Sequence, residues 1–162
     1  MNIHTPRKLV SIVLAVCVLS PAAVAAPGSA AQDVPASHWA KKSVDSVTSK
    51  GLMSAKNGAF DGNKPVTRYE LAVTLDRLVT YIEAGRKPLN PAPRPRAMKI
   101  PANTTPTERA AIKHLASDGF LPPTSPIFAG KGTEVVTAKQ LSTALSQVTI
   151  RLSDRRLAPD KD

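Results

Sequence analysis

The chain has 162 residues, with 22 lysines and arginines against 12 aspartates and glutamates. This length allows one or two small domains. The net charge of +10 excludes a neutral surface. The one cysteine, Cys17, excludes a disulfide within the chain and a thiolate metal site.

The first residues have the layout of a secretory signal peptide. Two basic residues, Arg7 and Lys8, precede the apolar run 9–19, and small residues follow it. The run is too short for a transmembrane helix, which needs roughly twenty residues. We expect cleavage after Ala25, or else after Ala31, and an exported mature chain with neither a cysteine nor a transmembrane segment. The alternatives are an uncleaved membrane anchor and a lipid attached to the cysteine of this run.

A basic, proline-rich linker is predicted at residues 85–99. It contains five basic residues, four prolines and no acidic residue. Prolines at this density exclude a helix or a central strand. The segment is therefore expected to be an extended spacer, or alternatively a basic arm for polyanions of the envelope.

Residues 32–84 and 100–153 repeat each other on either side of this linker. Apolar residues recur 68 positions apart in the first half of the repeat and 70 positions apart in the second half, as in Val44/Ile112, Val47/Leu115, Leu52/Phe120, Phe60/Phe128, Leu71/Leu141, Leu75/Leu145 and Leu78/Val148. The change of offset indicates a two-residue insertion between Phe128 and Val136. One structural unit is thus used twice, and residues 154–162 follow as a charged tail.

Each unit reads as helix, loop, helix, which predicts a mostly α fold. Apolar residues at helical spacing predict a first helix with Ser37 as its N-cap and Gly51 after its end. Thr67 and Glu70 form a capping box at the start of the second helix. The second copy repeats this device, with the pairs Thr105/Glu108 and Thr137/Gln140. Neither unit is expected to bury its apolar stripe alone.

Arg68 stands in the first turn of that second helix. The first amides of a helix lack intrahelical acceptors, and the helix dipole adds positive potential there. Together with the planar guanidinium they form an anion site suited to a carboxylate or phosphate. The alternative is a solvated arginine without a ligand.

Five short motifs in the first unit occur in the order found in one known family. The segment resembles an S-layer homology repeat through Asp33-Val34-Pro35, Trp39-Ala40, Gly51-Leu52, Gly58-Ala59-Phe60 and Thr67-Arg68-Tyr69-Glu70. The resemblance implies a helix–loop–helix fold and non-covalent anchoring to cell-wall carbohydrate. It also implies that Arg68 contacts an acidic group of the polymer, such as a pyruvate ketal.

Two aromatic residues have open roles. Tyr69 replaces the family's alanine, and either stacks on a sugar or packs on the linker. Trp39 is either a core residue, the more frequent role of tryptophan, or a second sugar platform. The second unit has Ala138 in place of the arginine, with Lys139 one position later, about 100° around the helix. It is interpreted as a degenerate repeat that keeps the fold and has lost the site.

The predicted function is envelope anchoring by binding acidic wall glycan or a peptidoglycan-associated polymer. One alternative is a structural or assembly adaptor that pairs with S-layer homology repeats of another envelope protein and binds no polymer itself. Another is a polyanion coat that acts through residues 86–99. Self-association, or pairing with another envelope protein, is expected as well. No nucleic-acid partner, cofactor or enzyme activity is expected, because no catalytic set or phosphate loop is evident. His38 and His114 lack the spacing of metal ligands.

Overall fold

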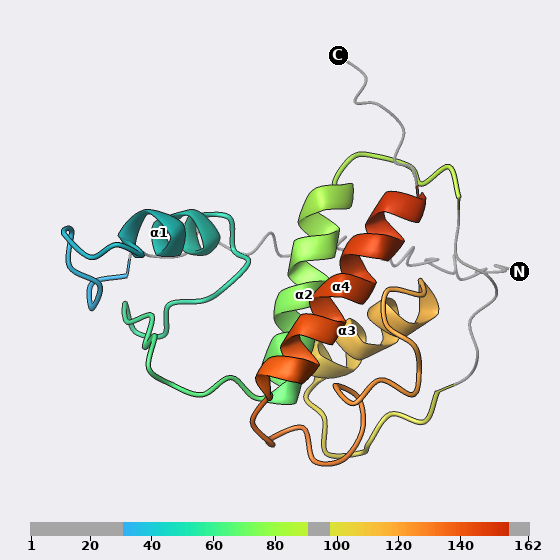
Figure 1. Ribbon diagram of the computed structural model, residues 1–162. Coiled ribbons are helices and arrows are strands. Elements are labelled where there is room, and N and C mark those ends of the chain that lie inside the picture. Colours follow the sequence, from blue (N-terminus) through green and yellow to red (C-terminus); the bar gives the residue numbers. More distant parts are fainter. Residues whose placement is uncertain (1–30, 91–97, 156–162) are drawn as a thin grey trace, which may run out of the picture.

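The computed structural model describes residues 31–90 and 98–155. In this part the chain forms four helices and no strand: α1 (Lys41–Ser49), α2 (Arg68–Glu83), α3 (Pro106–Ser117) and α4 (Ala138–Arg155) (Figure 1). The predicted mostly α fold is confirmed. None of these helices is long and apolar enough to cross a membrane. The expected signal peptide, the middle of the linker and the end of the tail lie outside the described residues.

The predicted capping boxes are present at α2 and α3. Thr67 accepts from the amide of Glu70 at 3.3 Å, and the Glu70 carboxylate accepts from the amide of Thr67 at 3.0 Å. Thr105 and Glu108 exchange the same pair of bonds. At α4 the Thr137 and Gln140 side chains also bond each other's amides. These short-range patterns fix where three of the four helices begin.

The predicted start of α1 is wrong. Its N-cap is Ala40, with no side-chain cap bond, and not Ser37. Two successive turns precede the helix, in which His38 donates to the carbonyl of Pro35 and Lys41 donates to the carbonyl of His38. The helix end is as predicted, because Gly51 adopts the left-handed conformation with φ 68°.

The two repeats share one core rather than forming two equal units. That core is built from α2, α3, α4 and the loop between α3 and α4, and α2 packs against both α3 and α4. Ile112, Leu115 and Phe120 are each at most 1% exposed. Of their first-repeat counterparts, only Val44 is buried. In Figure 1, α1 lies to one side of the other three helices.

Helices α2 and α4 run side by side and are joined at both ends. An antiparallel backbone bridge links Thr67 to Val135 just before the two helices begin. At the other end the Arg155 guanidinium forms ion pairs with Glu83 and Asp118 and lies 5.0 Å from the Phe120 ring centre. Arg155 is 4% exposed, so this buried cation is compensated by carboxylates from both repeats.

A histidine and a carboxylate connect α3 to α2. His114 bonds Asp76 through Nδ1 at 2.5 Å, and its Nε2 lies 3.9 Å from Asp118. The hydrogen bond to Asp76 is the largest cause that raises the pKa of His114 above its usual 6.5, and Asp118 and Glu83 add to it. The protonated imidazole therefore favours the packed arrangement of α2 and α3.

Tyr69 packs against backbone of the second repeat. Its ring is 4% exposed and belongs to the shared core. A Cβ added to Gly132 would lie 1.9 Å from Cδ2 of this ring. Residue 132 must therefore be glycine for the loop to approach the ring this closely. The φ angle of Gly132 lies outside the left-handed region, so glycine is required here for lack of space and not for its backbone conformation.

The His114–Asp76 pair predicts pH-dependent stability. Because the folded pKa is raised, the stabilisation is complete below the usual pKa of 6.5 and is lost as the pH rises through the folded value. The unfolding free energy, measured by chemical denaturation between about pH 6 and pH 9, should fall with rising pH. Asp76→Asn should flatten this dependence and cost about 1 kcal/mol at the acid end. Identical profiles for both proteins would contradict the assignment.

The Gly132–Tyr69 contact predicts a steric penalty. Gly132→Ala should lower the unfolding free energy by about 1–3 kcal/mol, the usual cost of overpacking a core. Gly62→Ala is the control, because its added Cβ meets the Phe60 ring only at 3.6 Å. It should change stability by less than about 0.5 kcal/mol. Equal costs for the two variants would show that the ring does not require glycine at position 132.

Candidate functional site

Arg68 lies where the two repeats meet. The capping box sets Arg68 as the first residue of α2, as the sequence predicts. Its side chain is only 16% exposed. The loop that precedes α4 crosses directly over this end of the helix, so residues of the second repeat surround it. Arg68 is therefore placed at a seam rather than on an open surface.

The amides at the start of α2 already have acceptors. The amide of Arg68 donates to the carbonyl of Glu134 at 3.0 Å, and that of Tyr69 donates to the carbonyl of Gly132 at 3.2 Å. The third, that of Glu70, donates to the cap residue Thr67. The expectation of free amides for an anion is thus wrong, because the second repeat satisfies them first.

The Arg68 guanidinium holds a carboxylate of its own chain. Its Nη2 lies 2.8 Å from Oε2 of Glu134, and its Nη1 donates to the carbonyl of Ala129 at 2.7 Å. The Glu134 side chain is 48% exposed, so water reaches the carboxylate. The arrangement demonstrates that this seam accommodates one carboxylate on Arg68. It also means that any external acid has to compete with Glu134.

The other predicted site residues are not gathered around Arg68. Tyr69 is buried against the loop of the second repeat, so it does not offer an exposed ring to a sugar. Trp39 is 88% exposed, so the expectation of a core tryptophan is wrong. Lys139 is exposed on α4, and Ala138 begins that helix where Arg68 begins α2.

The exposed Trp39 lies at the rim of a hollow in the first repeat. Its ring centre lies 5.6 Å from that of His38, and both residues line a space of about 620 Å³ together with Phe60. The Asp33 carboxylate fixes this loop by accepting from the amides of Phe60 and Asp61, at 2.7 Å each. Those two bonds hold the pKa of Asp33 below its usual value, so it stays ionised.

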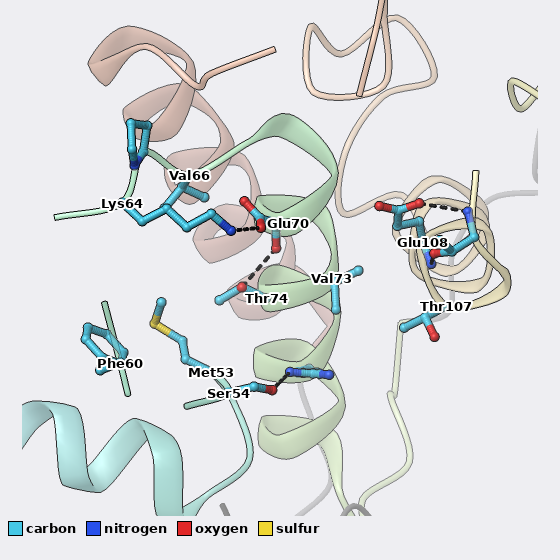
Figure 2. Close-up of a pocket in the computed structure, with 13 residues that line it drawn as sticks. Met53, Ser54, Phe60, Lys64, Val66, Glu70, Val73, Thr74, Thr107 and Glu108 are labelled. Carbon is cyan, nitrogen blue, oxygen red and sulfur yellow. Dashed lines mark hydrogen bonds and ion pairs between the residues drawn. The ribbon is translucent and has the colours of Figure 1, made fainter. Parts of the chain in front are cut away.

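A second pocket, of about 340 Å³, lies across α2 from the loop of the first repeat to the start of α3 (Figure 2). Arg77 lines it and donates to the Ser54 hydroxyl at 2.9 Å. Sequence reasoning missed Arg77, because only the folded chain brings it together with the start of α3. Within the described residues, no group of three or more His, Cys, Asp or Glu side chains is arranged to hold a metal ion.

Comparison with known proteins identifies the first repeat. Residues 32–72 match the S-layer homology domain. Outer membrane protein SlpA of Deinococcus radiodurans is 41% identical over 76 residues, which cover 43% of this chain and 6% of that protein. Outer membrane protein SlpA of Thermus thermophilus is 40% identical over 62 residues, which cover 38% of this chain and 7% of that protein.

The similarity covers less than half of this chain and a small part of each relative. The chain matches only a small part, 6 to 7%, of the length of these curated relatives. No solved structure matches the chain. The matched residues include α1, the loop with Phe60 and the first turn of α2 with Arg68. Residues 32–72 of this chain are therefore an S-layer homology domain, as the order of the sequence motifs predicts.

Proposed function

We propose that the chain is an exported envelope protein that anchors non-covalently to the cell wall. Its ligand is an acidic glycan or a peptidoglycan-associated polymer, bound through the first repeat. The support is the S-layer homology match at residues 32–72 and the relatives named as outer membrane proteins. The proposed role is binding and not catalysis.

The observation that carries this proposal is the carboxylate already held by Arg68. A guanidinium at the first turn of α2, 2.8 Å from the Glu134 carboxylate, has the chemistry required for an acidic sugar substituent. Arg68 belongs to the motif shared with the family, whereas Glu134 belongs to the second repeat. The external acid is proposed to replace Glu134, whose side chain is 48% exposed.

A second function, pairing with another envelope protein or with a second copy, is favoured by a different feature. A groove of about 530 Å³ runs along the seam of α2 and α4, and no charged residue lines it. Leu141 and Leu145 on α4 are 40% and 41% exposed there, and Val135 is 55% exposed. Apolar surface of this kind commonly marks a protein contact.

Opposite changes at the two ends of the Arg68–Glu134 pair test the glycan proposal. In co-sedimentation with purified wall sacculi at about 0.15 M ionic strength, Arg68→Ala should weaken binding about thirtyfold. This corresponds to about 2 kcal/mol for a lost charged hydrogen bond. Glu134→Gln should strengthen binding, because the competing carboxylate is gone. Lys139→Ala, on the degenerate repeat, is the control and should bind as the unchanged protein does.

Two results would count against this role of Arg68. Equal sedimentation of the unchanged protein and Arg68→Ala would remove the arginine from the site. Weaker binding by both Arg68→Ala and Glu134→Gln would mean that the pair only holds the repeats together. Binding that disappears for every variant between low and physiological salt would instead favour a nonspecific polyanion coat.

The apolar groove predicts self-association. In sedimentation equilibrium at micromolar concentration, the apparent molecular mass of the unchanged chain should exceed that of the monomer. The Leu145→Asp variant should have the mass of a monomer. The added carboxylate cannot be buried without a large desolvation cost. Ser142→Asp, exposed on α4 outside the groove, is the matched control and should still associate. A cooperative, well-folded monomer of the unchanged chain would refute pairing between copies.

A further inference from the structure

The pocket containing Arg77 is a second place where the structure brings together groups that bind sugars and acids. Figure 2 looks onto α2, with Met53 and Phe60 of the first-repeat loop on one side and Thr107 at the start of α3 on the other. Both repeats therefore contribute to its walls. None of the residues named so far for glycan binding lines this pocket.

Arg77 differs from the three arginines Arg68, Arg151 and Arg155 in the kind of partner that it has. Arg68, Arg151 and Arg155 each have a carboxylate within 2.8 Å. For Arg77, no carboxylate of the described residues lies within ion-pair distance, and its recorded partner is the neutral hydroxyl of Ser54. A guanidinium with a neutral partner keeps most of its charge available for an anion.

The acidic residues of this pocket are already engaged with other groups. Glu70 forms an ion pair with Lys64 at 2.8 Å and also caps α2. The Glu108 carboxylate accepts from the amide of Thr105 at 2.7 Å and lies at the positive end of its own helix. Figure 2 shows both carboxylates turned to these partners. Their charges are offset locally, which leaves the Arg77 cation for a ligand.

The remaining lining suits a carbohydrate. Met53, Phe60 and Val73 offer apolar surface for the C–H face of a sugar ring, and the hydroxyls of Ser54, Thr74 and Thr107 offer hydrogen bonds. Phe60 also lines the hollow beside the exposed Trp39. The two hollows thus share one aromatic residue, Phe60.

This pocket is separate from Arg68. Nine residues along a helix correspond to about 14 Å of rise and about half a turn of rotation. Arg77 therefore projects from the opposite side of α2, away from the seam that Glu134 closes. An acid bound at Arg77 does not have to displace a group of the protein.

We propose that this pocket is a second glycan subsite, in which Arg77 binds a carboxylate or phosphate borne on a sugar while the sugar ring lies against Phe60 and Met53. The proposal rests on the proposed wall-glycan function. It adds a ligand position centred on Arg77, which is not one of the family-motif residues. A polymer with repeated acidic groups then contacts both sides of α2.

Matched charge changes test the subsite. Binding of the full chain to polygalacturonate, phosphomannan and neutral mannan is measured by the fluorescence of Trp39, the one tryptophan of the chain. Arg77→Gln should weaken binding to the acidic polymer about tenfold, the usual effect of losing a charge-assisted bond. Arg109→Gln removes the same charge from an exposed arginine outside the pocket, and should change binding less than about twofold.

A second variant keeps Arg77 and neutralises its charge with a carboxylate from the protein itself. Ser54→Asp places a carboxylate beside Arg77, as Glu134 stands beside Arg68, and should weaken binding to the same degree as Arg77→Gln. Ser146→Asp, exposed on α4, makes the same charge change elsewhere and is the control. Since Ser54 is exposed, circular dichroism should show unchanged helicity for Ser54→Asp.

Each outcome decides between specific alternatives. A preference for polygalacturonate identifies a carboxylate as the ligand group, and a preference for phosphomannan identifies a phosphate. If Arg77→Gln and Arg109→Gln weaken binding equally, or Ser54→Asp binds as Ser146→Asp does, the subsite does not exist. If the unchanged chain also fails to sediment with wall sacculi, the glycan function itself fails. Sacculus binding that does not depend on Arg77 overturns only the subsite.

Discussion

The backbone bridge between Thr67 and Val135 is the constraint on which the rest of the described structure depends. It joins the chain just before α2 to the chain just before α4, so the two helices start level and run side by side. The same crossing sets Gly132 against Tyr69 and Glu134 against Arg68. It also leaves the apolar seam of α2 and α4 open to solvent. Fold, candidate site and candidate contact surface thus follow from one junction between repeats.

Arg68 and Arg77, the two arginines of α2 in the proposed sites, differ in whether a carboxylate of the protein neutralises their charge. Arg68 carries the family motif, but the second repeat satisfies it and its neighbouring amides. Arg77 lies outside the motif and keeps a neutral partner. The second predicted repeat has Ala138 at the position that matches Arg68, and it supplies the carboxylate beside that arginine. Helix α2 thus carries both arginines on which the two proposed ligand positions depend.

The sequence predicts what depends on neighbours three or four residues apart. The Thr67–Glu70 and Thr105–Glu108 boxes are local patterns and are found as expected, and the ordered motifs identify the domain. Ser37 fails as a cap because two turns delay α1. The ion pair of Arg68 and the hydrogen bond of Arg77 join segments far apart along the chain. The exposure of Trp39 likewise depends on the tertiary structure. No spacing within one repeat contains that information.

Wall anchoring through an acidic polymer is tested by co-sedimentation of the unchanged chain with purified wall sacculi, before and after the secondary acidic polymers are removed. We expect the protein to pellet with intact sacculi at physiological salt and to stay in the supernatant once those polymers are gone. Equal pelleting with both preparations would contradict recognition of an acidic polymer. Failure to pellet with intact sacculi would contradict wall anchoring altogether.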